Sequence, residues 1–160
     1  MAWTTPKTDW STGELVAASD LNAIGDNLAA LRNLGKAAYT TTEDIVADNR
    51  DFALIDSNNL NLTITTTGGD VLVHFHGSIT QVSHKSVFLD IEIDGASIGG
   101  VDGTFVNQLI WNKNYTARSL LSFTRLIQNL SAGSHIFKLQ WKGTGSNTLK
   151  AGAQFWVREI

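Results

Sequence analysis

The spacing of apolar residues changes once along this chain, at Gly35, and that change most limits the possible folds. Before Gly35, apolar residues recur at intervals of three and four, the spacing of an amphipathic helix. The residues with this spacing are Leu21, Ile24, Leu28 and Leu31. After Gly35, apolar and polar residues alternate, which is the period of β-strands. The sequence therefore predicts two parts, an N-terminal stem over residues 1–35 and a β head over residues 36–160.

The helical part is predicted over residues 20–34, with Ser19 as its N-cap, Asp20 in its first turn and Gly35 past its end. Its apolar stripe follows the a and d positions of a coiled coil, and Leu at a with Ile at d favours more than two helices. Two heptads are too few to form a stable coiled coil alone. We therefore expect Leu21, Ile24, Leu28 and Leu31 to form the stem part of a trimer interface. The alternative is that the helix covers its own head.

Residues 1–17 are predicted to form an extended arm, because Pro6 disfavours helix in the residue before it. The arm carries Trp3 and Trp10, two large aromatic side chains in a polar segment. We expect these two residues to anchor the chain on another protein.

The head is predicted to be an antiparallel β-sandwich. Alternation is clear over residues 60–64, 71–75 and 87–93, the first two of which read as a hairpin, and further strands are expected over residues 104–111, 118–128, 135–141 and 152–160. Only 17% of the residues are charged, and Thr, Ser, Asn and Gly, which suit strands and turns, are abundant. Because no helix is expected between these strands, antiparallel pairing in two packed sheets follows.

The last predicted strand has two apolar faces. Phe155 and Val157 lie on one face, and Trp156 and Ile160 lie on the other. One face can line the core, and large aromatic residues concentrate at the centres of interfaces. We therefore expect Trp156 and Ile160 in the head part of a trimer interface, although a strand buried on both sides within one chain would show the same pattern.

Charge and cysteine content exclude several kinds of function. The net charge is −3 and the twelve basic residues are scattered, so no nucleic-acid partner is expected. The absence of cysteine excludes disulfides, thiolate zinc sites and thiol catalysis. No apolar run is long enough for a membrane span, so we expect no membrane insertion. A protein made in a cytoplasm and kept soluble fits these features.

Ser97 lies in Gly-x-Ser-x-Gly, the pattern of a nucleophile elbow, at residues 95–99. An elbow requires a helix directly after the serine, whereas a glycine-rich turn follows here. We therefore expect a hairpin turn, no enzymatic activity and no cofactor.

Two polar clusters could bind a metal. Asp90, Glu92 and Asp94 alternate as in the start of a calcium loop, but the twelfth position is Val101, so we expect a solvated strand face, the alternative being a calcium site shared with Asp102. His74 and His76 share one face of a strand, and three chains would supply six imidazoles, enough for an octahedral transition metal. The alternative is a pair of half-exposed surface histidines, and His135 shows no evident partner.

Several segments resemble known proteins. Residues 3–7, 10–22 and 26–31 resemble the opening of many small tail- or head-associated proteins of tailed bacteriophages, and residues 68–73, 130–142 and 154–160 resemble the jelly-roll head that often follows it. The Leu-Ser-Ala-Gly-Ser-His turn at 130–135 is also similar to a turn in the trimeric tumour-necrosis-factor and complement C1q heads.

The resemblance implies a jelly-roll head in a homotrimer, displayed on a virion surface after synthesis in the host bacterial cytoplasm. The arm would attach it to capsid or tail proteins, and the head would act as a fibre head or capsid decoration and contact a host-surface glycan or protein. No long shaft is present between stem and head, which departs from a typical tail fibre. The alternative function is a soluble carbohydrate-binding module that uses Trp111 and Trp141.

Overall fold

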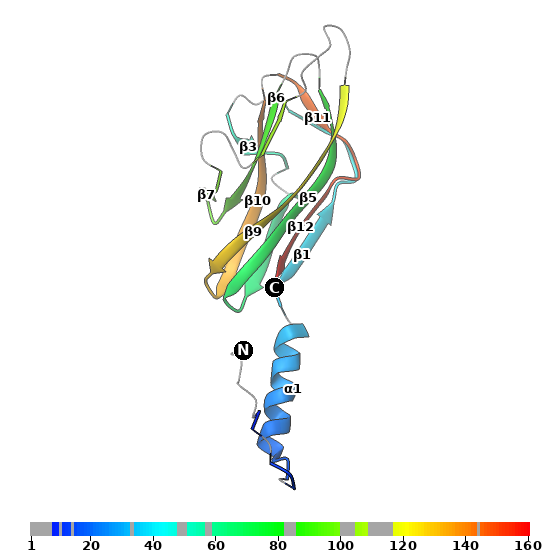
Figure 1. Cartoon of the computed structure of the whole chain (residues 1–160). Coiled ribbons are helices and arrows are strands. Elements are labelled where there is room, and N and C mark those ends of the chain that lie inside the picture. Colours follow the sequence, from blue (N-terminus) through cyan, green and yellow to red (C-terminus); the bar gives the residue numbers. More distant parts are fainter. Residues whose placement is uncertain are drawn as a thin grey trace.

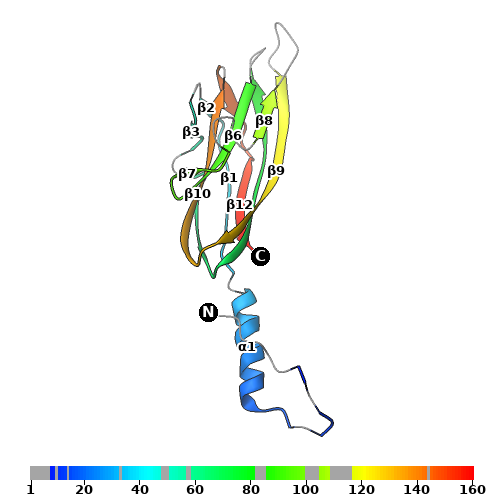
Figure 2. The same cartoon turned by 60° about the vertical axis from the view of Figure 1, so that its left-hand side comes forward.

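The chain folds into an elongated β-sandwich with one helix standing beyond one end (Figures 1 and 2). The structure is a computed structural model, and it describes residues 8–9, 11–13, 15–32, 34–47, 51–56, 59–81, 86–99, 105–108, 117–143 and 145–160. The predicted mainly β class, with antiparallel sheets and one short helix, is confirmed.

The helix α1 (Ala18–Arg32) begins earlier than the sequence predicts. The Ala17 N–H donates to the Asp20 carboxylate at 3.2 Å, so Asp20 reaches back to the cap as the third residue of a capping box does. Ser19 therefore lies within the helix and is not its N-cap. The prediction was wrong because a carboxylate three residues into a helix can cap it as well as a serine before it.

A buried glutamate fixes the point where the stem meets the head. Glu159 accepts the Gly35 N–H at 3.2 Å and the Thr67 N–H at 2.7 Å, and its own N–H donates to the Gly35 carbonyl at 2.8 Å. A Cβ atom at Gly35 would collide with the Thr65 carbonyl. The glycine thus permits the close approach that lets one carboxylate hold the junction.

One sheet, called sheet A, is built around the long strand β5 (Gly69–Gln81). Along one edge β5 pairs with β9 (Ala117–Leu130), and along the other with β12 (Gln154–Glu159) and then β11 (Asn147–Leu149). The outer positions are taken by β1 (Lys36–Thr40) beside β12 and β2 (Ile45–Ala47) beside β11. Since β1 directly follows the stem, sheet A is the sheet joined to the helix.

The other sheet, called sheet B, is built around β10 (Gly133–Gly143). Along one edge β10 pairs with β4 (Asn61–Thr66) and β3 (Ala53–Leu54), and along the other with β6 (Ser86–Ile93). The far edge of β6 pairs with β7 (Ala96–Ser97) and β8 (Phe105–Gln108).

The hairpin predicted from residues 60–75 is wrong. β4 pairs with β10 in sheet B, whereas β5 pairs in sheet A, so the turn between them crosses from one sheet to the other. Both strands point their apolar residues into the same core from opposite sides. Alternation specifies which residues face inward but not which strand lies alongside, so a hairpin and a crossing turn have the same pattern.

The core lies between the two sheets and is closed within one chain. Inward residues of β5, β6, β10 and β12 are fully buried, among them Phe75, Phe137, Leu139 and Phe155. Each such side chain contributes about 1.5–3 kcal/mol to stability by leaving water. The head therefore contains the apolar burial that a folded domain of this size requires.

Candidate functional site

The outer face of sheet A carries an aromatic pair at its centre. The strand register places Thr124, His74, Trp156 and Ala38 in one row across β9, β5, β12 and β1. The His74 and Trp156 rings stack with centroids 4.9 Å apart and planes inclined by 22°. The Nδ1 atom of His74 lies 2.9 Å from the Thr124 hydroxyl. The row is therefore fixed in place by a hydrogen bond and a ring contact.

The surroundings of His74 favour the neutral form of its imidazole. Burial against its neighbours, together with the nearby His76, lowers the pKa of His74 below its ordinary value of 6.5. His74 and His76 do share one face, but one ring nitrogen of His74 is engaged by Thr124. Within the described residues no group of three or more His, Cys, Asp or Glu could hold a metal ion. A metal at His74 and His76 remains a prediction that requires several chains.

The same face also carries exposed apolar side chains, interspersed with polar residues such as His76, Ser122 and Arg158. Leu120 is 73% exposed, Ile160 55% and Leu126 41%, and Val46 at the outer edge is also exposed. A groove of about 380 Å³ runs beside Trp156, lined by residues 36–38 and 156–158. Strand β12 thus buries Phe155 and Val157 in the core and leaves Trp156 and Ile160 on the surface, so the alternative of a last strand buried on both sides does not hold.

The outer face of sheet B is polar, and its charges are paired. Lys138 contacts the Glu92 carboxylate at 2.7 Å, and the Gln140 amide also donates to Glu92. The Lys142 ammonium lies 5.0 Å from the centre of the Phe88 ring. This face pairs Glu92 and Lys138 within the chain, whereas the outer face of sheet A mixes exposed apolar side chains with polar ones.

The carboxylates on β6 do not form a solvated face as predicted. Asp90 is fully buried, and it accepts the Ile91 N–H at 2.8 Å and the hydroxyl of Ser97 from the short strand β7. Glu92 binds Lys138, and Asp94 binds a third set of partners. The three carboxylates therefore point to separate partners instead of converging on one ion.

Ser97 lies in the hairpin expected for it. Asp94 and Gly95 have φ values of 51° and 88° and form the two-residue turn between β6 and β7. The Ser97 hydroxyl donates to the Asp90 carboxylate. Its place in a two-residue strand, followed by a bend at residues 98–99, does not match the strand-to-helix turn of a nucleophile elbow.

His135 has a partner that the sequence did not reveal. Its Nδ1 lies 2.7 Å from the Asp94 carboxylate and its Nε2 lies 2.9 Å from the Ser131 carbonyl. These two bonds raise the pKa of His135, and the imidazole in turn lowers the pKa of Asp94. The two residues are 41 positions apart in the sequence, so no local pattern would have predicted this pair.

The stem presents its predicted stripe to the surface. Leu21 is 59% exposed, Ile24 43% and Leu28 57%, and α1 stands clear of the sandwich in both views (Figures 1 and 2). The alternative that the helix covers its own head therefore does not hold for these three residues. The side chain of Leu31 and the residues Trp3 and Trp10 lie outside what the structure describes.

The sugar-binding residues expected from the sequence are not on the surface together. Trp141 is 2% exposed and faces the core from β10, so it cannot stack on a sugar ring. Alternation itself points to this position, because Trp141 shares its side of β10 with the buried Phe137 and Leu139. Trp111 lies outside the described residues.

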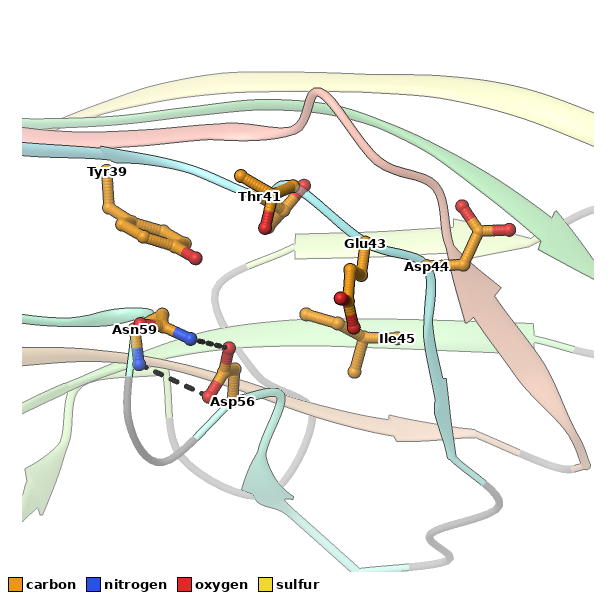
Figure 3. A pocket seen from close by; sticks show the side chains of 8 residues that line it. Tyr39, Thr41, Glu43, Asp44, Ile45, Asp56 and Asn59 are labelled. Carbon is orange, nitrogen blue, oxygen red and sulfur yellow. Dashed lines mark hydrogen bonds between the residues drawn. The ribbon is translucent and has the colours of Figure 1, made fainter.

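A polar pocket of about 270 Å³ opens at the edge of the sandwich, between the segment joining β1 to β2 and the segment joining β3 to β4. Figure 3 shows Tyr39, Glu43 and Asp56 converging on one space, while Asp44 points away from it. Sequence reasoning did not identify this pocket, because it depends on two segments that lie in different sheets.

No helix in the described part of the chain is long and apolar enough to cross a membrane. No protein-family model matches the chain, and no curated protein matches it.

Among solved structures, the chain is similar to Eiger TNF from S. frugiperda, with a TM-score of 0.55 at 10% identity, over 81% of this chain and 94% of that one. At this identity the likeness shows the fold alone, and with the two-sheet topology it confirms the predicted jelly-roll head.

Two further structures are similar at lower scores. The infectious bursal disease virus Gx strain structure has a TM-score of 0.38 at 13% identity, over 77% of this chain and 32% of that one. The latent PorU of Porphyromonas gingivalis has a TM-score of 0.36 at 10% identity, over 76% of this chain and 13% of that one. Scores this low carry no argument about function.

Proposed function

We propose that this chain is a non-enzymatic structural protein of a tailed-bacteriophage virion, a trimeric surface-exposed head attached to capsid or tail proteins through its N-terminal arm. The observation that carries the proposal is the presence of two sets of exposed apolar side chains in one chain, the α1 stripe and the apolar residues on the outer face of sheet A. Further copies of the same chain would cover the α1 stripe and the apolar residues of sheet A at once.

The free energy of apolar burial favours covering the α1 stripe and the apolar residues of sheet A in one assembly. A stripe of two heptads is too short to hold helices together by itself. Burying each Leu or Ile of the stripe would contribute about 1.5–3 kcal/mol, and a central Trp is the residue type that most often dominates interface energy. Because β1 follows α1 after a junction held by Glu159, the stem and sheet A can approach a common axis. Stem and head would therefore assemble as one unit.

The virion location is supported by the resemblance of the arm and stem to the openings of phage tail- and head-associated proteins. The short stem favours a capsid decoration or short head fibre over a long receptor-binding fibre. Ser97 occupies a hairpin and bonds to Asp90, so the strongest catalytic motif in the sequence supports a structural role instead of catalysis.

Quantitative mass spectrometry of purified virions from the phage or prophage that encodes the chain tests the proposal. We expect the chain in the particles in a multiple of three copies, hundreds if it decorates the capsid and a few if it belongs to the tail. Light scattering of the purified chain at micromolar concentration should give a trimer. A monomer in solution together with absence from particles would overturn the proposal.

A further inference from the structure

The pocket between the β1–β2 and β3–β4 segments is lined by some polar groups that are held by hydrogen bonds and by others that have no partner among the described residues. Asn59 donates from its N–H and its side-chain amide to the Asp56 carboxylate at 3.2 and 2.9 Å, which holds that carboxylate in place (Figure 3). The Thr41 hydroxyl accepts the Ala153 N–H at 2.9 Å and is held by the neighbouring turn. These bonds make the pocket a preformed feature of one chain.

Two polar groups in the pocket lack a partner among the described residues, the Tyr39 hydroxyl and the Glu43 carboxylate. Both point into the same space as Asp56 (Figure 3). Asp44 differs, because its carboxylate binds the Lys150 ammonium and accepts the Ala151 N–H at 2.9 Å outside the pocket. The pocket therefore combines free hydrogen-bonding capacity with a rigid acceptor.

The lining residues restrict the kind of ligand. None of the residues that line the pocket is Lys, Arg or His, and two carboxylates face inward, so an anionic ligand would be repelled. A metal ion is disfavoured, because the described residues contain no group of three or more acidic, His or Cys side chains able to hold one. A neutral ligand with several hydroxyl groups fits, because hydroxyls can donate to carboxylates and accept from a phenol.

Size and apolar surface point the same way. About 270 Å³ lies near the lower limit of roughly 300 Å³ for a small-molecule pocket, which suits one sugar ring and not a longer chain. The Tyr39 ring and Ile45 add apolar surface for the C–H groups of such a ring. We propose that this pocket binds a neutral saccharide unit through Tyr39, Glu43 and Asp56. The proposal goes beyond the assembly role, because the pocket is complete within one chain.

Saturation-transfer NMR on the full-length protein tests the proposal, with methyl glycosides of neutral hexoses and N-acetylhexosamines as probes. We expect at least one glycoside to bind, and Glu43→Gln to weaken it by about tenfold or more, since a hydrogen bond to a charged group is lost. Tyr39→Phe, which removes one hydroxyl, should weaken binding by severalfold. Asp26→Asn, the same kind of charge change on the exposed stem, should leave binding unchanged.

Three results would overturn the saccharide site. These are the absence of binding by every neutral glycoside, binding that Glu43→Gln and Tyr39→Phe leave unchanged, and binding only of an anionic sugar or of calcium. Repeating the titration with Leu28→Asp separates this proposal from the assembly proposal. Binding retained in a dissociated variant supports a site within one chain, whereas loss of binding on dissociation would place the site between chains and contradict the inference.

Discussion

Sheets A and B share one core, yet their outer faces differ in how their side chains are satisfied. On sheet B, Glu92 binds both Lys138 and Gln140, so the charged face is complete in a single chain. On sheet A, the His74–Trp156 pair shares its face with exposed leucines and an exposed isoleucine as well as polar residues, and the helix attached to this sheet exposes an apolar stripe. The core of the sandwich is therefore complete within one chain, whereas on our proposal the exposed apolar residues of sheet A and of the stem are buried only on assembly.

The stem stripe should give the largest effect when it is altered. Leu28→Asp would place a carboxylate from each chain at the proposed helix contact, removing about 2 kcal/mol of apolar burial per chain and adding unpaired buried charge. We expect the trimer to dissociate at micromolar concentration, while the head keeps its fold because its core is closed. Size-exclusion chromatography with light scattering measures this. Asn22→Asp carries the same charge change off the stripe and should remain trimeric.

Trp156→Ala tests the same contrast in the head. A central interface Trp costs about 2 kcal/mol or more when truncated, so the trimer dissociation midpoint should shift by more than about tenfold. Phe88→Ala on the outer face of sheet B is the matched aromatic control, and it should change head stability without changing assembly. A shift with Phe88→Ala but not with Trp156→Ala would reverse the assignment of the two faces.

Acidification should weaken sheet A more than sheet B. The pKa of His74 in the folded state is lowered from 6.5, so the folded state favours the neutral ring, and stability is lost as the pH falls below about 6.5. Protonation would also place charge beside His76 and Arg158 on the proposed contact. We expect dissociation at pH 5 at protein concentrations that give a trimer at pH 7.5. His74→Gln should remove most of this dependence, and an unchanged profile in that variant would contradict it.

The smallest effect on stability is expected at the pair formed by His135 in β10 and Asp94 in the turn after β6. The raised pKa of His135 contributes stability that is complete below pH 6.5 and is lost as the pH rises through the raised value. The lowered pKa of Asp94 contributes stability above pH 3.8 that is lost in stronger acid. Asp94→Asn should therefore cost about 1 kcal/mol or less near pH 5.5 and less at pH 9, measured by urea unfolding. A cost that rises with pH would contradict the pairing.

The sequence predicts which residues share a face of a strand better than it predicts which strands pair. Alternation placed Phe155 and Trp156 on opposite faces, since side-chain direction in a strand depends on residue parity, but it did not specify which of these two apolar faces lines the core. It did not predict that β4 and β5 lie in different sheets, because parity is the same in either arrangement.

The candidate sites were less predictable than the fold. The alternative sugar-binding function required Trp141 on the surface, but Trp141 lies in the core beside Phe137 and Leu139. The His135–Asp94 pair and the Tyr39–Glu43–Asp56 pocket form only when segments distant in the sequence come together, so no local residue spacing predicts them. The expectations for Trp3, Trp10 and the metal at His74 and His76 remain predictions.

Sedimentation equilibrium of the wild-type chain and of Trp156→Ala tests whether sheet A and the stem form the assembly surface. At neutral pH and micromolar concentration, the wild type should have three times the 17.4 kDa mass of one chain. Trp156→Ala should shift towards that single-chain mass with its head still folded. A wild-type chain that sediments as a monomer, or a Trp156→Ala variant that assembles as tightly as the wild type, would contradict the account.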